Sequence, residues 1–316
     1  MNEQNELVSI LMPVYNVEKY IKKAIVSILD QTYKNFELIV VDDCSTDSTY
    51  GIAQKLALGD SRVKLFKNEE NKKIARTLNA ALQKAKGKYI ARMDGDDISD
   101  PHRIEKLFIF LKTNTDINLV GSDILSIDEE DNIIGNTRYL SNQVLIEKTK
   151  KYASPVSHFW MTYKYVYDKL EGYRDISGVE DYDFLLRMNT AGYTFSNINE
   201  YLYYIRLRTE GNTRFTIGPV HIKLHDYAYR LYRERSTFEV DSFSEYGYKR
   251  CFKINGVLLL LHNFSSKKLL ESIILKSKKK YCMMFFCICL SLISPYQIKY
   301  LYNRLKYRII IKINNC

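Results

Sequence analysis

The 13 glycines of this 316-residue chain never stand two or five positions apart. The Gly-x-Gly-x-x-Gly turn and the Walker A loop each need such a pair, so both phosphate-binding motifs are excluded. The six cysteines include no Cys-x-x-Cys pair, and we expect reduced, buried thiols rather than disulfides or a zinc site. The first six residues contain neither a basic nor an apolar segment, so we expect no secretory signal.

Acidic residues are scarce at the C-terminal end. Residues 251–316 hold 12 Lys and Arg and one acid, whereas the whole chain carries a net charge of +10, so the remainder is close to neutral. Tyr281 to Ser294 has no charge. As a helix it would be roughly 21 Å long, shorter than the ~30 Å apolar core of a bilayer. We therefore expect an interfacial or re-entrant anchor on an anionic membrane, with a buried core helix as the alternative.

Apolar segments alternate with amphipathic ones through the first part of the chain. This alternation predicts an α/β fold with a mostly parallel central sheet flanked by helices. We expect Pro13 to end the first strand, because proline cannot donate to a ladder. The segment 201–205 is typical of an edge strand. We expect a catalytic domain over residues 1–215 and a helical, basic and apolar, membrane-associating region over residues 216–316. The predicted strands are 7–12, 36–41, 63–66, 89–92, 117–127 and 201–205, and the predicted helices are 18–30, 49–58, 74–86, 101–112, 141–151 and 180–191.

Carboxylates follow two of the predicted parallel strands. Asp42 and Asp43 end the second strand, and Asp94, Asp96 and Asp97 follow the fourth. Open α/β sheets bind ligands outside the carboxyl ends of their strands, so we expect these side chains in one crevice. An Asp-x-Asp pair can hold a divalent cation and, through it, a phosphate; the alternative is a solvated acidic turn.

A third acidic pair, Glu180-Asp181, stands at the start of a predicted helix. Carboxylates in a first helical turn also suit the helix dipole without any catalytic role. The pair therefore gains significance only in combination with the acidic residues at the strand ends.

Four motifs occur in order along the chain: Ser-Ile-Leu-Met-Pro-Val-Tyr-Asn at 9–16, Val-Asp-Asp-Cys-Ser-Thr-Asp at 41–47, Ala-Arg-Met-Asp-Gly-Asp-Asp at 91–97, and Glu-Asp at 180–181. Together they resemble the signature of family 2 glycosyltransferases with the GT-A fold. The resemblance covers about residues 7–212 and implies an inverting transfer from a nucleotide sugar.

The resemblance also assigns a nucleotide pocket. It implies that Pro13, Val14 and Tyr15 line the nucleoside. Asp43 would accept a hydrogen bond from a uracil ring, with Asp42 nearby.

The same resemblance assigns the metal and the chemistry. Asp94 would meet the ribose or the metal, and Asp96 would ligate Mn²⁺ or Mg²⁺. Asp181 would be the catalytic base, supported by Glu180. Arg208 stands where the family often has His, so we expect it to contact phosphate.

The acceptor is the least defined part of the prediction. His158 is expected to contact acceptor or diphosphate, or else to be a hydrogen-bonded buried histidine. The Gln-x-x-Arg-Trp motif of processive synthases is missing, since the single Trp is Trp160. We therefore expect non-processive transfer of a hexose, glucose or galactose, from a UDP-sugar.

The expected acceptor is a lipid-linked sugar such as GlcNAc-diphospho-undecaprenol, with a β-linkage formed in O-antigen or other surface-polysaccharide synthesis. The expected location is peripheral, on the cytoplasmic face of the inner (plasma) membrane. The alternatives are a nucleic-acid-binding protein that uses its basic tail and a catalytically inactive sugar-binding GT-A module. A nucleotidyltransferase would normally need a glycine-rich phosphate loop near the N-terminus, and this loop is missing. We expect no nucleic acid partner.

Overall fold

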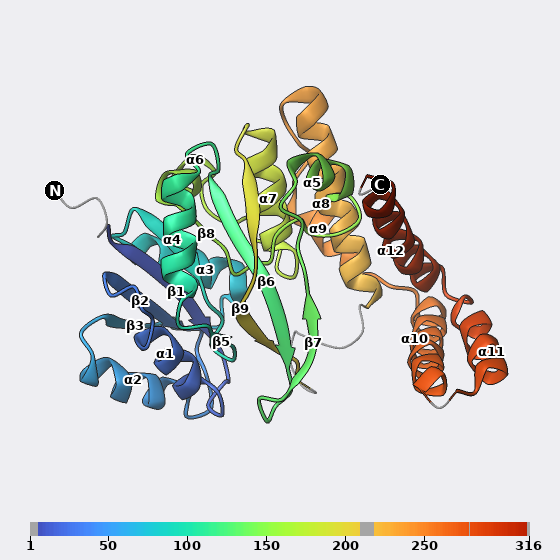
Figure 1. The fold of residues 1–316 in the computed structure, drawn as a ribbon, viewed down its shortest axis with the longest axis horizontal. Coiled ribbons are helices and arrows are strands. Elements are labelled where there is room, and N and C mark those ends of the chain that lie inside the picture. The colour runs from blue at the N-terminus through green and yellow to red at the C-terminus, as the bar shows by residue number, and fades with distance from the viewer. Residues whose placement is uncertain (1–5, 209–217, 278, 315–316) are drawn as a thin grey trace. The chain divides into compact units, whose positions relative to one another are not determined.

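The computed structural model describes residues 6–208, 218–277 and 279–314 (Figure 1). The chain divides into two compact units. The first contains Met1–Ile146 and Pro155–Thr213, and the second contains Glu147–Ser154 and Arg214–Cys316. The described residues of the first unit build the sheet, and those of the second are mainly helical.

The described strands form one nine-stranded sheet of order β3-β2-β1-β4-β8-β6-β9-β5, with β7 paired to β6. The first four strands are parallel, as the alternation of strand and helix predicts. Beyond them the sheet is mixed, because β8 runs antiparallel to both β4 and β6. The strands are β1 Val8–Val14, β2 Phe36–Asp42, β3 Val63–Lys67, β4 Tyr89–Arg92, β5 Ile98–Ser99, β6 Leu119–Ile127, β7 Ile133–Thr137, β8 Met161–Tyr163 and β9 Phe195–Arg206.

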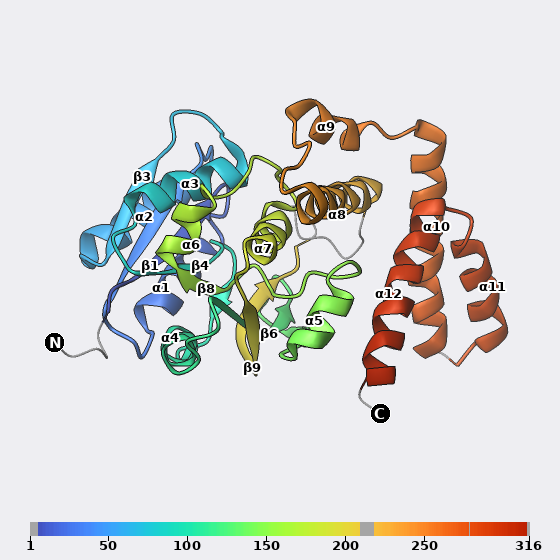
Figure 2. The same cartoon turned by 90° about the horizontal axis from the view of Figure 1, so that it is seen from above.

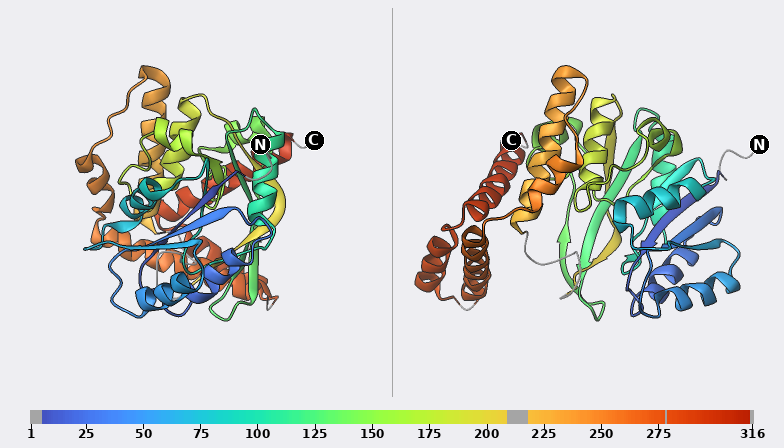
Figure 3. Two further views of the ribbon diagram at one scale, coloured as in Figure 1. Left: turned by 90° about the vertical axis from the view of Figure 1, so that its left-hand side faces the viewer. Right: turned by 180° about the vertical axis from the view of Figure 1, so that it is seen from behind.

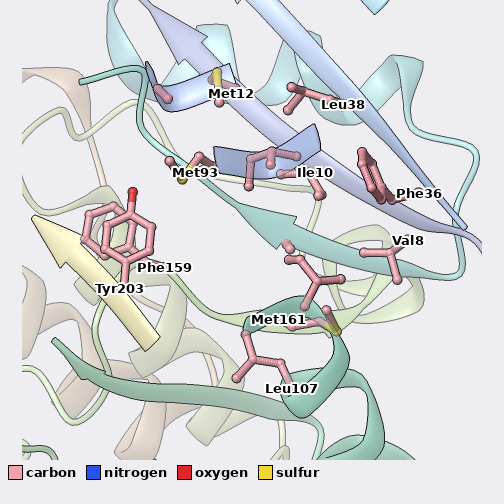
Figure 4. Close-up of a cluster of buried hydrophobic side chains, with 14 of the residues drawn as sticks. Val8, Ile10, Met12, Phe36, Leu38, Met93, Leu107, Phe159, Met161 and Tyr203 are labelled. Carbon is pink, nitrogen blue, oxygen red and sulfur yellow. The ribbon is translucent and has the colours of Figure 1, made fainter. Parts of the chain in front are cut away.

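Helices cover both faces of this sheet (Figure 3). Alternate residues of β1 point to opposite faces, so Ile10 packs with helices α1, α2 and α4, and Leu11 packs with α3, α6 and α7. Figure 4 shows the first of these two cores, with Met12 near its top and Leu107 near its bottom. The helices of this part are α1 Ile21–Leu29, α2 Thr49–Gly59, α3 Lys73–Lys84, α4 Arg103–Thr113, α5 Gln143–Thr149, α6 Lys164–Lys169 and α7 Glu180–Thr190.

Pro13 does not end the first strand, contrary to the prediction. Toward β4, Leu11 O accepts a hydrogen bond from Met93 N, and toward β2, Val14 O accepts one from Asp43 N. Backbone groups alternate sides along a strand, so Pro13 faces the β4 side. The pairing of β1 with β4 ends at Leu11, and no donor is needed at Pro13.

The segment 201–205 is not an edge strand. It belongs to the longer β9, which lies between β6 and β5 in the sheet. β9 is parallel to β6, from the Leu119–Phe195 pair to the Ile127–Arg206 pair. The strand β8 was not predicted either. It is only three residues long, yet it lies between β4 and β6 and joins the parallel strands to the rest of the sheet.

The second unit contains a series of helices, and α10 and α11 lie side by side within it (Figure 2). No single described helix is long and apolar enough to cross a membrane; α11 and α12 meet that test only as a pair, which is bent by 112°. The five cysteines within the described residues are free, but Cys282 and Cys289 are exposed rather than buried as predicted. The elements are α8 Pro219–Phe238, α9 Glu245–Lys249, the 3₁₀ helix Arg250–Phe252, α10 Gly256–Ser277, α11 Tyr281–Ser291 and α12 Pro295–Asn314.

Candidate active site

The loop after β4 lies against the end of β1. A Cβ atom on Gly95 would stand 2.5 Å from Val14 Cγ1, so any larger residue would push this loop away. Pro13 and Val14 are buried in β1, whereas Tyr15, the next residue, is 46% exposed. The residues assigned to the nucleoside pocket therefore border the Asp-x-Asp loop, and Tyr15 is the one open to a ligand.

The two aspartates at the end of β2 have different surroundings. Asp43 accepts hydrogen bonds from Asn68 Nδ2 at 2.8 Å and from the backbone N–H groups of Lys72 and Lys73 at 2.8 and 2.9 Å. Asp42 accepts one from Ser45 N through Oδ2, while its buried Oδ1 has no partner among the described residues. Both side chains are covered, with Asp42 0% and Asp43 5% exposed, so the unpartnered Asp42 Oδ1 lies inside the protein.

Asp94 and Asp96 each face a cationic side chain. Arg92 Nε lies 3.2 Å from Asp94 Oδ1, and Arg208 Nε lies 3.0 Å from Asp96 Oδ2. Arg208 therefore meets the carboxylate that the sequence assigned to the metal, and its guanidinium also lies over the ring of Tyr20.

These surroundings shift the two carboxyl pKa values in opposite directions. Burial raises the pKa of Asp94, but Arg92 and His158 outweigh burial and hold it below its usual range. Burial raises the pKa of Asp96 above its ordinary value; Arg208 opposes this shift, and the negative charge of Asp94 adds to it. The charge of Asp96 is thus only partly compensated by the protein itself.

His158 lies between the Asp-x-Asp loop and helix α7. Its Nε2 is 3.5 Å from Asp94 Oδ2, and its Nδ1 is 3.6 Å from Asp181 Oδ2. The imidazole is 27% exposed, so His158 is not the fully buried histidine of the alternative prediction. Asp181, the second residue of α7, is itself 23% exposed and open to a substrate hydroxyl.

Glu180 has a different environment from its neighbour. Its Oε1 lies 3.3 Å from Arg92 Nη1, and its Oε2 accepts a hydrogen bond from Gly178 N. Burial and the charge of Asp181 raise the pKa of Glu180, while Arg92 opposes the shift. Glu180 therefore holds the start of α7, and the accessible carboxylate is that of Asp181.

The loop is held by Asp97 and by two residues that the sequence analysis did not place in the site, Tyr203 and Arg206. Tyr203 Oη donates to Asp97 Oδ2 at 2.9 Å, and Arg206 N donates to Asp97 Oδ1 at 2.7 Å. Arg206 Nε also donates to Asp96 O, and Asp94 N donates to Tyr203 Oη. Asp97 is thus a buried anchor between the loop and β9.

Arg92 is the third residue that the sequence analysis did not place in the site, and it carried a signal in the sequence. An arginine in an otherwise apolar strand, two positions before Asp94, indicates a buried charge that needs a carboxylate partner. Tyr203 and Arg206 carried no comparable signal, because their contacts span more than 100 residues of sequence.

The donor set fits a hard divalent cation, although no three candidate metal ligands converge within the described part of the chain. Asp94 and Asp96 supply carboxylate oxygens, the ligands that Mg²⁺ and Mn²⁺ prefer. The raised pKa of Asp96 shows that Arg208 leaves part of its charge uncompensated. Two protein carboxylates completed by phosphate oxygens are a common arrangement for such ions.

The fold is of the GT-A class. Over 98% of this chain and 91% of the other, it superposes with a TM-score of 0.60 and 17% identity on Staphylococcus aureus TarS (residues 1–349) in complex with UDP-GlcNAc. A mannosyltransferase from Pyrobaculum calidifontis in complex with GDP-Man and Mn²⁺ gives a TM-score of 0.57 at 17% identity, covering 94% of this chain and 86% of its own.

Sequence comparison then gives the family. The family model described as "Glycosyl transferase family 2" matches residues 9–171. An uncharacterized glycosyltransferase of Haemophilus influenzae is 32% identical over 86% of this chain and 85% of its own length. The O-antigen biosynthesis glycosyltransferase WbnJ of Escherichia coli is 31% identical over 73% of this chain and 91% of its own. The chain belongs to glycosyl transferase family 2.

Proposed function

We propose that this enzyme transfers a hexose from a UDP-sugar to a lipid-linked sugar, with inversion at the anomeric carbon. The observation that carries the proposal is the position of His158, within 3.6 Å of both Asp94 and Asp181. The imidazole ring of His158 therefore lies between Asp94, which is assigned to the donor, and Asp181, which is assigned to the acceptor. Direct transfer needs this proximity, because the anomeric carbon of the donor passes from its phosphate to the acceptor hydroxyl.

The residues divide the chemistry between them. Transfer builds positive charge at the anomeric carbon and negative charge on the departing diphosphate. Asp181 accepts the proton of the attacking hydroxyl, from the face opposite the diphosphate. Arg208 carries positive charge beside Asp96 and neutralises phosphate. When bound, a divalent cation held by Asp94 and Asp96 supplies further charge that stabilises the leaving group.

The nucleotide occupies the end of β1 and β2 in this proposal. Tyr15 lies against the base or ribose, next to the buried Pro13 and Val14. Asp43 accepts from the base, with Asp42 nearby, and Asp43 also shapes the neighbouring loop through its three hydrogen bonds.

Glucose or galactose is the favoured sugar, and a sugar diphospholipid such as GlcNAc-diphospho-undecaprenol is the favoured acceptor. The similarity to WbnJ, named for O-antigen biosynthesis, supports a role in surface-polysaccharide synthesis. TarS is described in complex with UDP-GlcNAc, which supports a UDP-linked donor. A peripheral position on the cytoplasmic face of the plasma membrane would give access to such an acceptor.

The proposal is tested with purified protein, a panel of UDP- and GDP-sugars and synthetic GlcNAc-diphospho-lipid, with Mn²⁺, with Mg²⁺ or with EDTA. We expect transfer of one hexose per acceptor, with a UDP-sugar and only with a divalent cation. Transfer from a GDP-sugar alone would contradict the donor assignment, and full activity in EDTA would contradict the metal assignment.

A further inference from the structure

The last three helices enclose polar side chains. His262 on α10 lies with Nδ1 3.3 Å from Ser294 Oγ and Nε2 3.3 Å from Ser266 Oγ. Ser266 Oγ also donates to Gln297 Oε1 at 3.1 Å, and Ser294 N donates to Ser265 Oγ at 3.1 Å. Apart from the half-buried Ser266, these side chains are almost completely buried.

Helix α11 has the reverse arrangement of a helix in a water-soluble bundle. Of its eleven residues, all of them described, only Cys287 and Ser291 are buried, and they lie one turn apart. Cys287 faces α10, where its Sγ is 3.9 Å from Glu271 Oε2. Its large apolar side chains are outside: Tyr281, Met283, Phe285 and Phe286 are 57–67% exposed.

The same pattern continues on the neighbouring helices. Large apolar residues remain exposed on α10 and α12: Val257, Leu259, Leu260, Phe264, Leu270, Ile298, Tyr302, Leu305, Ile309 and Ile313. In water the hydrophobic effect would turn such residues inward and polar ones outward. In lipid, helices instead associate through small residues and interhelical hydrogen bonds, with large apolar residues outside.

The charges around α11 indicate which apolar environment these helices enter. Lys279 and Lys280 directly precede α11 and are exposed, and α11 itself carries no charge on any face. Glu271 is the one acid among residues 251–316, and it is paired with Lys268. Basic residues beside an uncharged apolar helix complement the anionic headgroups and the acyl region of a bilayer.

We infer that α11 inserts into one leaflet of an anionic membrane, while the buried polar contacts tie the turn after α11 and the start of α12 to α10. The eleven residues of α11 make a helix about 16 Å long, close to the ~15 Å apolar depth of one leaflet. The sharp bend of 112° before α12 brings the chain back without crossing. This inference deepens the proposed membrane location, and it depends on neither the sugar nor the acceptor.

The occupant that competes with lipid is a second copy of the chain. A self-association surface would also bury Phe285 and Phe286. It gives no reason for the lysines beside α11, which would approach like charges in a symmetric dimer. The charge pattern therefore favours the bilayer, and the test distinguishes the two.

The test uses the full chain with vesicles of phosphatidylcholine, with and without phosphatidylglycerol, in flotation at low and high salt. The variant is Phe285→Ser with Phe286→Ser. The matched control is Leu58→Ser with Ile109→Ser, which removes two exposed apolar residues, 85% and 51% exposed, from the first unit.

We expect wild type and control to float with anionic vesicles and to stay bound in high salt. The Phe variant should lose at least about tenfold in partition at high salt, because it removes two large apolar side chains from the part of α11 that enters the acyl region. Equal binding of the variant and wild type would overturn the inference. So would an absence of vesicle binding together with a dimer, seen in analytical ultracentrifugation, that the variant loses.

A tryptophan probe reports insertion itself. Trp160, the natural tryptophan, is completely buried, so Phe285→Trp adds a signal that lipid can reach. Lipids brominated on the acyl chain should quench Phe285→Trp and leave Leu58→Trp unchanged. Equal quenching of the two would contradict insertion.

Transfer to a soluble acceptor is measured on the same samples. A wild-type protein that transfers normally but does not bind anionic vesicles would refute insertion alone. Normal insertion without transfer from any nucleotide sugar would refute the proposed function alone.

Discussion

Arg92, at the end of β4, and Glu180, at the start of α7, form an ion pair that is almost wholly buried. Arg92 Nη1 lies 3.3 Å from Glu180 Oε1, and the two side chains are 3% and 6% exposed. Arg92 also contacts Asp94, so one guanidinium joins the loop of Asp94 and Asp96 to the helix that carries Asp181. Burial opposes the charge of Arg92, but Asp94, Glu180 and Asp181 raise its pKa well above the ordinary value.

Replacing Arg92 with Met should therefore be costly. The change leaves Asp94, Glu180 and Asp181 close together without their shared cation, and breaking a buried pair from one side costs about 3–5 kcal/mol. Glu180→Gln should cost less, because Glu180 already has a raised pKa and Gln can still accept from Gly178 N. Urea unfolding at neutral pH measures both, and equal costs for the two variants would contradict this account.

Asp181→Asn tests the proposed base. The amide is nearly isosteric but cannot accept the acceptor's proton, so kcat should fall by about 10²–10⁴-fold. Binding of the UDP-sugar, measured by calorimetry, should stay at the wild-type level. Glu180→Gln, which changes a positioning residue, is expected to lower kcat less. A normal rate for Asp181→Asn would show that another group is the catalytic base. Asp183 could not replace it, because it is completely buried and paired with Arg187.

Asp96→Asn should stabilise the protein in metal-free buffer while abolishing transfer. The folded-state pKa of Asp96 is raised, so its ionised form costs free energy at neutral pH, and this cost disappears below the unfolded-state pKa. The variant's thermal midpoint should thus exceed that of the wild type at pH 7. The difference should shrink as the pH falls through the raised pKa. A difference in thermal midpoint that grows as the pH falls would contradict a raised pKa for Asp96.

Gly95→Ala should disturb donor binding through packing alone. The new methyl group would stand 2.5 Å from Val14 Cγ1, and overpacking of this kind costs about 1–3 kcal/mol. We expect a higher KM for the donor as the Asp94–Asp96 loop moves. The control is Gly59→Ala, where the added Cβ meets nothing within 4 Å and the donor KM should not change.

Local patterns account for the part of the fold that the sequence predicted. The parallel order around β1 follows from strands and helices that alternate at short spacing. The strand β8 was not predicted, because three residues are too few to show the alternation of buried and exposed side chains. Residues 201–205 were assigned to an edge strand because their pairing partners, in β5 and β6, lie far away in sequence. Long-range pairing is decided by packing between distant segments, which no local pattern records.

The candidate site shows the same division. Asp42, Asp94 and Asp96 were placed by their positions at strand ends, and Asp181 by its resemblance to a family motif. The contact between Arg92 and Glu180 spans 88 residues of sequence, and only the folded chain shows it. His158 was left with two interpretations because its neighbours, Asp94 and Asp181, come from two separate segments.

The anomeric configuration of the product tests the central claim most directly. The wild-type enzyme, supplied with an α-linked UDP-hexose and the lipid-linked acceptor, should form a β-linkage, because Asp181 directs the hydroxyl to the face opposite the diphosphate. The proton coupling at the anomeric carbon, measured by NMR of the purified product, reads this configuration. A β-linked product is the predicted result. An α-linked product would contradict the inverting mechanism and the role proposed for Asp181.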